Sequence, residues 1–239
     1  MARKSRQHHE QGEVVFEEVA PDGNGQGGLM KWVLAHREKI SYVVGGIAVA
    51  ILGYFAYRNF VIKPQQEEAL SFFTQAEQYF LVDSFQQAAY GSGAVMGFVD
   101  IAEEYGATPA GNAAALYAGL ALRNLGQFDE ALTYLEAFDP PTALMEVIKE
   151  GAMGDVKAEL RHYAEAAHHY EAAATRFQNE AFTPFYLFKA GLMHEWSGNY
   201  EEAVEWYRRL QQEYPQAPTA ATIKGYIARA EAKAIGAGQ

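Results

Sequence analysis

The sequence predicts an all-α protein, in which an N-terminal transmembrane helix is followed by an α-solenoid of helical hairpins. Three observations lead to this fold class: one uncharged apolar stretch, the lack of strand-like alternation elsewhere, and a pattern of small and aromatic residues that recurs along the chain. The chain divides into a cytoplasmic tail, residues 1–28, an interfacial segment with the transmembrane helix, residues 29–62, and a repeat domain, residues 63–239.

The tail combines mixed charges with glutamine and the glycine-rich run GNGQGG, and it contains few large apolar residues. A segment of this composition cannot bury enough apolar surface to offset the entropy that ordering costs. We therefore expect residues 1–28 to be disordered.

The apolar stretch Ile40–Tyr57 contains eighteen residues without a charge. As a helix it would be about 27 Å long, close to the roughly 30 Å hydrocarbon core of a bilayer. Glycines such as Gly45, Gly46 and Gly53 are common in spans but unfavourable in a helix exposed to water. A cleaved signal peptide would have a shorter apolar core and a small-residue cleavage site, whereas this stretch ends in the bulky sequence YFAYRNF. A buried core helix of a soluble protein would need apolar neighbours that the flanking sequence lacks.

The charges that flank the apolar stretch predict its orientation. Basic residues in short loops stay in the cytoplasm, whereas long domains cross the membrane largely regardless of their charge. The tail side is the more basic one, so we expect a cytoplasmic N-terminus and a repeat domain across the membrane. The basic residues are Arg3, Lys4, Arg6, Lys31, Arg37 and Lys39 before the stretch, and Arg58 and Lys63 after it.

The net charge of −11 argues against nucleic-acid binding. From Pro64 onward there are 11 Lys and Arg against 24 Asp and Glu, so the repeat domain carries −13 and would repel phosphates. The chain has no cysteine, which excludes disulfides, thiol chemistry and zinc sites built on cysteine.

The repeat domain contains three copies of one spacing pattern. Each copy has a small residue in its first helix, an aromatic residue that opens the second helix, and an alanine three residues later. Successive first-helix glycines are 35 and 37 residues apart, which is the length of a two-helix unit. The equivalent residues are Gly119, Gly126, Phe128, Ala131 and Leu135; Gly154, Arg161, Tyr163, Ala166 and Tyr170; and Gly191, Gly198, Tyr200, Ala203 and Tyr207.

A weaker copy precedes these three, with Ala76, Tyr79, Phe85 and Ala88 as its marked positions. The insertion between this copy and Gly119 contains one more predicted helix, Phe98–Tyr105, which a break at Gly106–Pro109 follows. The last segment, from about Thr219 to Ala234, is expected to be a solvated capping helix.

This spacing resembles the tetratricopeptide repeat, in which a small residue of helix A lets helix B approach and an aromatic residue opens helix B. The Gly154 copy departs from the pattern, because Arg161 stands at the turn position where glycine is usual.

The order of the parts is more specific than the repeat alone. A short tail, one span near residue 50 and a repeat domain resemble the ancillary SecYEG translocon subunit family of bacterial inner membranes, and the segment GFVDIAEEYGATPAGNAAALYAG looks like that of Bacteroidetes-type members. The resemblance implies a periplasmic repeat domain that docks near the translocon and binds a membrane-anchored prolyl-isomerase-like chaperone. Exported proteins are further candidate clients.

The sequence offers little evidence of catalysis. It has no phosphate-binding loop and no dinucleotide glycine fingerprint. His162, His168 and His169 cluster in one hairpin, but the zinc motif His-Glu-x-x-His is absent, and adjacent histidines point apart on a helix. We therefore predict no enzyme activity, no catalytic residues, no metal, no cofactor and no small-molecule substrate. An enzyme would be reconsidered only if the His162–His169 hairpin bound zinc.

Stacked hairpins are suited to binding, because their inner helices form an extended concave surface. Repeat-family geometry would place helix A positions there, where large aromatic side chains could anchor a partner segment. The alternative is that several of these side chains belong to the hairpin cores. The predicted partner-binding residues are Phe73, Phe80, Leu116, Leu120, Arg123, Asn124, Asp155, Phe185, Phe188, Leu192 and Trp196.

Two functions fit these features. The favoured one is a membrane-anchored, non-catalytic interaction module that links the Sec translocon to periplasmic chaperones. The alternative is a scaffold subunit of another cell-envelope machine, such as one for cell-wall or outer-membrane assembly.

Overall fold

The computed structural model describes residues 32–237, and the tail predicted to be disordered, residues 1–28, lies outside this range. The chain forms two compact units, one that ends at Phe55 and one that begins at Ala56. Within residues 32–237 every named element is a helix, and the one strand-type pairing is an isolated bridge between Ser92 and Val95. The predicted all-α fold is confirmed.

Helix α2, Arg37–Tyr57, contains the whole apolar stretch, and none of its residues is buried. A π-helical turn, η1, follows at Arg58–Ile62, and α3 begins at Lys63. Within the described range one continuous helical stretch, Arg37–Leu81, is long and apolar enough to cross a membrane. The apolar stretch therefore has the helical structure and length that a span requires.

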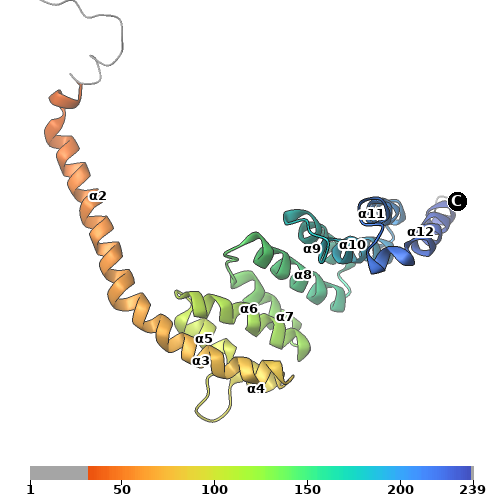
Figure 1. Ribbon diagram of the computed structural model, residues 1–239, viewed down its shortest axis with the longest axis horizontal. Coiled ribbons are helices and arrows are strands. Elements are labelled where there is room, and N and C mark those ends of the chain that lie inside the picture. The colour runs from red at the N-terminus through yellow and green to blue at the C-terminus, as the bar shows by residue number, and fades with distance from the viewer. Residues whose placement is uncertain (1–31, 238–239) are drawn as a thin grey trace, which may run out of the picture. The chain divides into compact units, whose positions relative to one another are not determined.

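Helical hairpins form the second unit (Figure 1). In each hairpin an A helix is followed, after a short turn, by a B helix that packs against it. The insertion helix α5 has the predicted bounds, Phe98–Tyr105, and packs on α6. The hairpins are α3, Lys63–Leu81, with α4, Phe85–Tyr90; α6, Pro109–Asn124, with α7, Phe128–Ala137; α8, Ala143–Glu159, with α9, Tyr163–Arg176; and α10, Thr183–Ser197, with α11, Tyr200–Glu213.

The four hairpin turns share one backbone geometry. A residue with positive φ follows each A helix, and the next residue donates its N–H to the carbonyl five positions earlier, as in Ser84 to Tyr79 at 2.9 Å and His162 to Lys157 at 2.9 Å. This pattern is a Schellman motif, which glycine favours because it has no Cβ. The residues with positive φ are Asp83 at 57°, Gly126 at 76°, Arg161 at 60° and Gly198 at 86°.

The repeated glycines of the A helices allow the B helices to come close. A Cβ on Gly154 would lie 2.6 Å from the ring of Tyr170, and one on Gly191 would lie 2.5 Å from the ring of Tyr207. Gly119 has the same relation to Leu135, at 2.6 Å. The helix pairs therefore depend on glycine at these positions, as the repeat spacing predicts.

The C-terminal segment begins differently from the prediction. Pro218–Ala221 form a 3-10 turn, η2, and the final helix, α12, runs over Ile223–Ala237. The helix is not solvated all round, because Ile223 and Ala230 are fully buried against the last hairpin. It covers the apolar face that α10 and α11 would otherwise expose, which is how a terminal cap stabilises a solenoid.

Candidate functional site

A groove of about 620 Å³ lies along the C-terminal parts of the A helices in the second unit. The turns that follow α6 and α8 have the same backbone geometry. The C-terminal ends of these two A helices therefore lie side by side, and polar side chains from both line the groove. The groove is lined by Arg123 and Asn124 of α6; Gly126 and Phe128; Asp155, Ala158 and Glu159 of α8; Tyr170 of α9; and Lys189, Leu192, Met193 and Trp196 of α10.

Asp155 is the centre of a hydrogen-bonded network at this groove. Nη1 of Arg123 donates to its Oδ2 at 2.8 Å, and Oη of Tyr170 donates to its Oδ1 at 2.7 Å. Nζ of Lys189 donates to the same Oδ1 at 2.5 Å. One carboxylate therefore joins residues of α6, α9 and α10, and charge-assisted bonds of this kind are among the stronger ones in proteins.

Burial and the charge of Asp155 raise the pKa of Tyr170 well above its usual value of 10.0. The pKa of Tyr186, whose ring stacks on that of Tyr170, is raised for the same two reasons. Tyr170 consequently stays protonated and acts as a donor to Asp155 throughout the physiological range. The Asp155 network in the groove is thus ordered by its own hydrogen bonds.

Trp196 provides an exposed apolar surface in the same groove. Its side chain is 53% exposed, and its ring packs edge-on against Tyr163 at a centroid distance of 5.3 Å. Leu192 and Phe128 are half-buried beside it in the lining. A rigid, partly exposed indole next to ordered polar groups is the usual composition of a protein-binding hot spot.

The structure brings together five of the predicted partner-binding residues. Arg123, Asn124, Asp155, Leu192 and Trp196 all line the groove. Whether they bind a partner stays a prediction, but their position on one concave surface is the arrangement that such a role requires.

Two further predicted residues lie outside the lining. Phe185 is 45% exposed and lies under Nζ of Lys189, which is 4.7 Å from the centre of its ring. Leu120 is half-buried and packs against the core.

The remaining predicted residues take part in core packing. Phe73 and Phe80 make T-shaped ring contacts with Tyr117 at centroid distances of 5.1 and 5.3 Å, and Leu116 is 5% exposed. Phe188 packs against Tyr226 of α12 at 4.9 Å. We leave these four out of the binding surface, because their side chains already fill hairpin and cap contacts.

Sequence reasoning did not select Lys189 and Tyr170 as binding residues. Tyr170 enters the prediction only as an equivalent position of its repeat, and Lys189 lies two residues before the repeat glycine Gly191. The opposite charges of Arg123 and Asp155 on neighbouring A helices were a usable signal for the network. Such a signal does not say which further donors reach the carboxylate.

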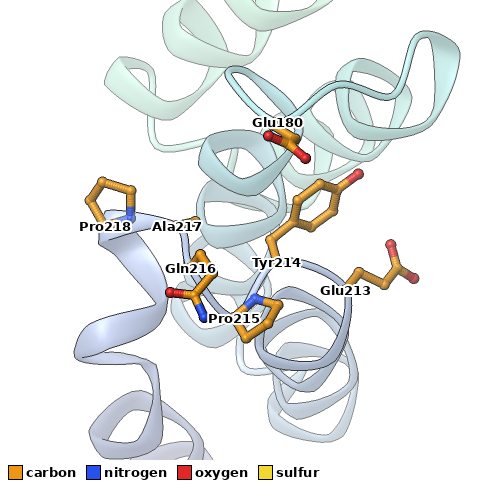
Figure 2. Close-up of a pocket in the computed structure, with 7 residues that line it drawn as sticks. All are labelled: Glu180, Glu213, Tyr214, Pro215, Gln216, Ala217 and Pro218. Carbon is orange, nitrogen blue, oxygen red and sulfur yellow. The ribbon is translucent and has the colours of Figure 1, made fainter.

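A second, smaller cavity of about 320 Å³ lies at the turn between α11 and η2. It contains none of the predicted partner-binding residues. Figure 2 shows its lining, in which Glu180 joins Glu213, Tyr214 and the segment Pro215–Pro218.

Two histidines of the His162–His169 hairpin contact glutamate side chains in the structure. Nδ1 of His169 lies 2.7 Å from Glu150, and Nδ1 of His162 lies 3.6 Å from Glu165. Within residues 32–237 no three His, Asp or Glu side chains are placed to hold a metal ion together. His169 thus joins α9 to α8, and His162 contacts the first turn of α9.

Comparison with known families agrees with the fold. A family model described as tetratricopeptide repeat matches residues 152–218, which extend from the second half of α8 to the start of η2. No curated protein matches the chain. The match supports a tetratricopeptide-repeat protein, a class of helical scaffolds that mediate protein–protein interactions and are generally non-catalytic.

Proposed function

We propose that this protein is a membrane-anchored, non-catalytic interaction module whose groove binds a segment of another protein. The observation that carries the proposal is the exposed Trp196 beside the ordered Arg123–Asp155–Lys189 network. A surface that is already ordered loses little entropy on binding, and an exposed indole gains most from being covered.

The apolar helix α2 would be the anchor. Its charge-free stretch Ile40–Tyr57 has the length of a span, and the excess of basic residues before it favours a cytoplasmic N-terminus. The protein would then be a single-pass protein of a bacterial inner membrane, with its repeat domain in the periplasm.

We assign the module to the Sec translocon, as an accessory that links it to membrane-anchored, prolyl-isomerase-like chaperones. The order of tail, span and repeats supports this assignment. A module anchored beside the translocon would keep a chaperone close to exported chains as they emerge, because tethering raises the effective concentration.

Site-specific crosslinking tests the function, and the chain is well suited to it because it has no cysteine. Leu192→Cys places a single thiol in the groove, and Thr133→Cys places one on the exposed side of α7 as a matched control. With a photoactivatable thiol reagent in native membranes, we expect adducts with translocon or chaperone subunits from Leu192→Cys and none from Thr133→Cys.

Adducts with cell-wall or outer-membrane assembly proteins instead would favour the scaffold alternative. Equal labelling from both positions, or none from either, would contradict a binding role for the groove.

A further inference from the structure

The acidic residues of the repeat domain are unevenly distributed. Residues 64–139, which cover α3 to α7, contain 11 Asp and Glu and a single basic residue, Arg123, for a net charge of −10. Residues 140–239 contain 13 Asp and Glu and 10 Lys and Arg, for a net charge of −3. The excess negative charge therefore belongs to the hairpins on one side of the groove.

These carboxylates are not neutralised by any cation within residues 32–237. Of the 11, all but Glu77 are exposed, and no ion pair of residues 32–237 includes any of them. The single cation of this region, Arg123, pairs with Asp155 of the following hairpin. An uncompensated field of this kind attracts cations from a distance of about one Debye length, roughly 8–10 Å.

The groove itself has balanced charges, but they are not equally available. Arg123 and Lys189 are both paired with Asp155, whereas Glu159 is exposed at the edge of the groove with no cation in ion-pair contact among residues 32–237. An anionic partner would have to compete with Asp155 for both cations and approach against the field. A cationic partner would find the exposed carboxylate of Glu159 and the exposed part of the Trp196 indole, and indole rings bind cations well.

We propose that the segment bound in the groove is basic and apolar, with Lys or Arg side chains next to an aromatic or aliphatic anchor. This inference rests on the proposed function of the same groove and adds the chemical class of its partner. The anchor packs on Trp196 and Leu192, and the cations face Glu159 and the acidic hairpins α3–α7. Charge complementarity thus selects the partner, while the apolar contact holds it.

Fluorescence anisotropy with three labelled synthetic peptides tests the inference on the full chain in nanodiscs of phosphatidylcholine. In the first peptide lysine alternates with leucine, in the second glutamine replaces lysine, and in the third glutamate does. Empty nanodiscs of the same lipid show how much peptide binds the bilayer alone. We expect the lysine peptide to bind about ten-fold or more tightly than the glutamate peptide, with a difference that shrinks as added salt screens the charges.

Substitutions separate the two parts of the surface. Trp196→Ala should weaken the lysine and glutamine peptides alike, by about ten-fold, because both lose the anchor. Glu159→Gln should weaken only the lysine peptide, by about three-fold, because it removes one rim charge. Glu202→Gln, at an exposed position of α11 outside the groove lining, is the matched control and should leave all three affinities unchanged.

The outcomes distinguish the inference from the function on which it rests. If all three peptides bind equally and Trp196→Ala weakens each of them, the groove binds protein segments but the charge preference is wrong. If the glutamate peptide binds best, or the lysine peptide does not bind, the inference is overturned. If Trp196→Ala leaves every affinity unchanged, the groove is not the site and the proposed function fails with it.

Discussion

Arg161 shows how a single residue adapts to a repeat that is built around glycine. It takes a φ of 60° at the position where Gly126 and Gly198 have 76° and 86°. The turn keeps its hydrogen bond, His162 N–H to the carbonyl of Lys157, so the helix pair forms in spite of the side chain. The left-handed conformation costs an L-residue with a Cβ about 1–2 kcal/mol.

Arg161→Gly is therefore expected to stabilise the protein. Part of the gain is offset by the greater freedom of glycine in the unfolded chain, so we expect an increase of about 0.5–1 kcal/mol in the free energy of unfolding. Urea unfolding followed by circular dichroism measures the change. Arg161→Ala is the control, because it removes the guanidinium but keeps the strained φ, and an equal gain from both variants would mean that φ is not the cause.

Gly154 permits a second prediction about a single residue. Gly154→Ala would place a methyl group 2.6 Å from the ring of Tyr170, which also holds Asp155. Overpacking of a core contact costs about 1–3 kcal/mol, and we expect that loss in the free energy of unfolding.

Gly225→Ala makes the same chemical change in α12, where a Cβ would meet nothing within 4 Å. There the better helix propensity of alanine should stabilise the protein by about 0.5–1 kcal/mol. If Gly154→Ala and Gly225→Ala changed the free energy of unfolding in the same direction, close packing at Gly154 would not be what distinguishes the two positions.

At the scale of elements, the capping helix α12 is joined to α10 by a buried carboxylate. Glu195 is 3% exposed, and Arg229 donates to both of its oxygens at 2.7 Å. Lys233 adds a third bond at 2.9 Å. Arg229→Ala would leave this carboxylate without its main partner, at a cost of about 1.5–3 kcal/mol.

The bonds to Glu195 also predict a pH dependence. Burial by itself favours the neutral acid, but the hydrogen bonds from Arg229 and Lys233 hold the pKa of Glu195 below its usual 4.5. The folded state therefore binds this proton less readily than the unfolded chain does. The stabilisation is complete above pH 4.5 and is lost as the pH falls through the folded pKa.

Glu195→Gln removes the titrating group and serves to measure this effect. The difference in melting temperature between the wild-type protein and the variant should be greatest near neutral pH and shrink below about pH 4.5. A difference that stays constant down to pH 3 would contradict the assignment to Glu195, and Glu202→Gln on the surface of α11 is the matched control.

At the scale of the whole molecule, the proposed membrane anchor can be tested through the apolar helix α2. Val49→Arg combined with Leu52→Arg would place two charges in the middle of the stretch, each of which costs about 2.5–3.5 kcal/mol for insertion. We expect the wild-type protein to stay in the membrane pellet after carbonate extraction and the double variant to move to the supernatant. Gly45→Leu, which makes the stretch more apolar, is the control and should stay in the pellet.

The periodic part of the fold could be predicted from the sequence because its determinants are local. The spacing of Gly119, Gly154 and Gly191 marks where one helix packs on the next, and the aromatic residues that open the B helices mark the turns. Pro109 and the break before it likewise mark the end of α5 and the start of α6.

The binding surface could be predicted only in part. All the selected residues occupy helix A positions, yet Phe185 is exposed near the N-terminal end of α10, outside the groove lining, whereas Phe188, three residues later, is covered by α12. The repeat pattern predicts which residues lie in an A helix. It does not predict which neighbouring hairpin or capping helix covers each side chain.

The sequence by itself thus determined the helical repeat, its turns and the apolar stretch, since each shows in the residue types of one helix or one turn, or in the regular spacing of small and aromatic residues. Only the tertiary structure decided that Asp155 gathers Arg123, Tyr170 and Lys189, and that Glu195 holds the cap. These contacts join residues that are 15 to 34 positions apart in the chain, and the way the helices pack decides which residues become partners.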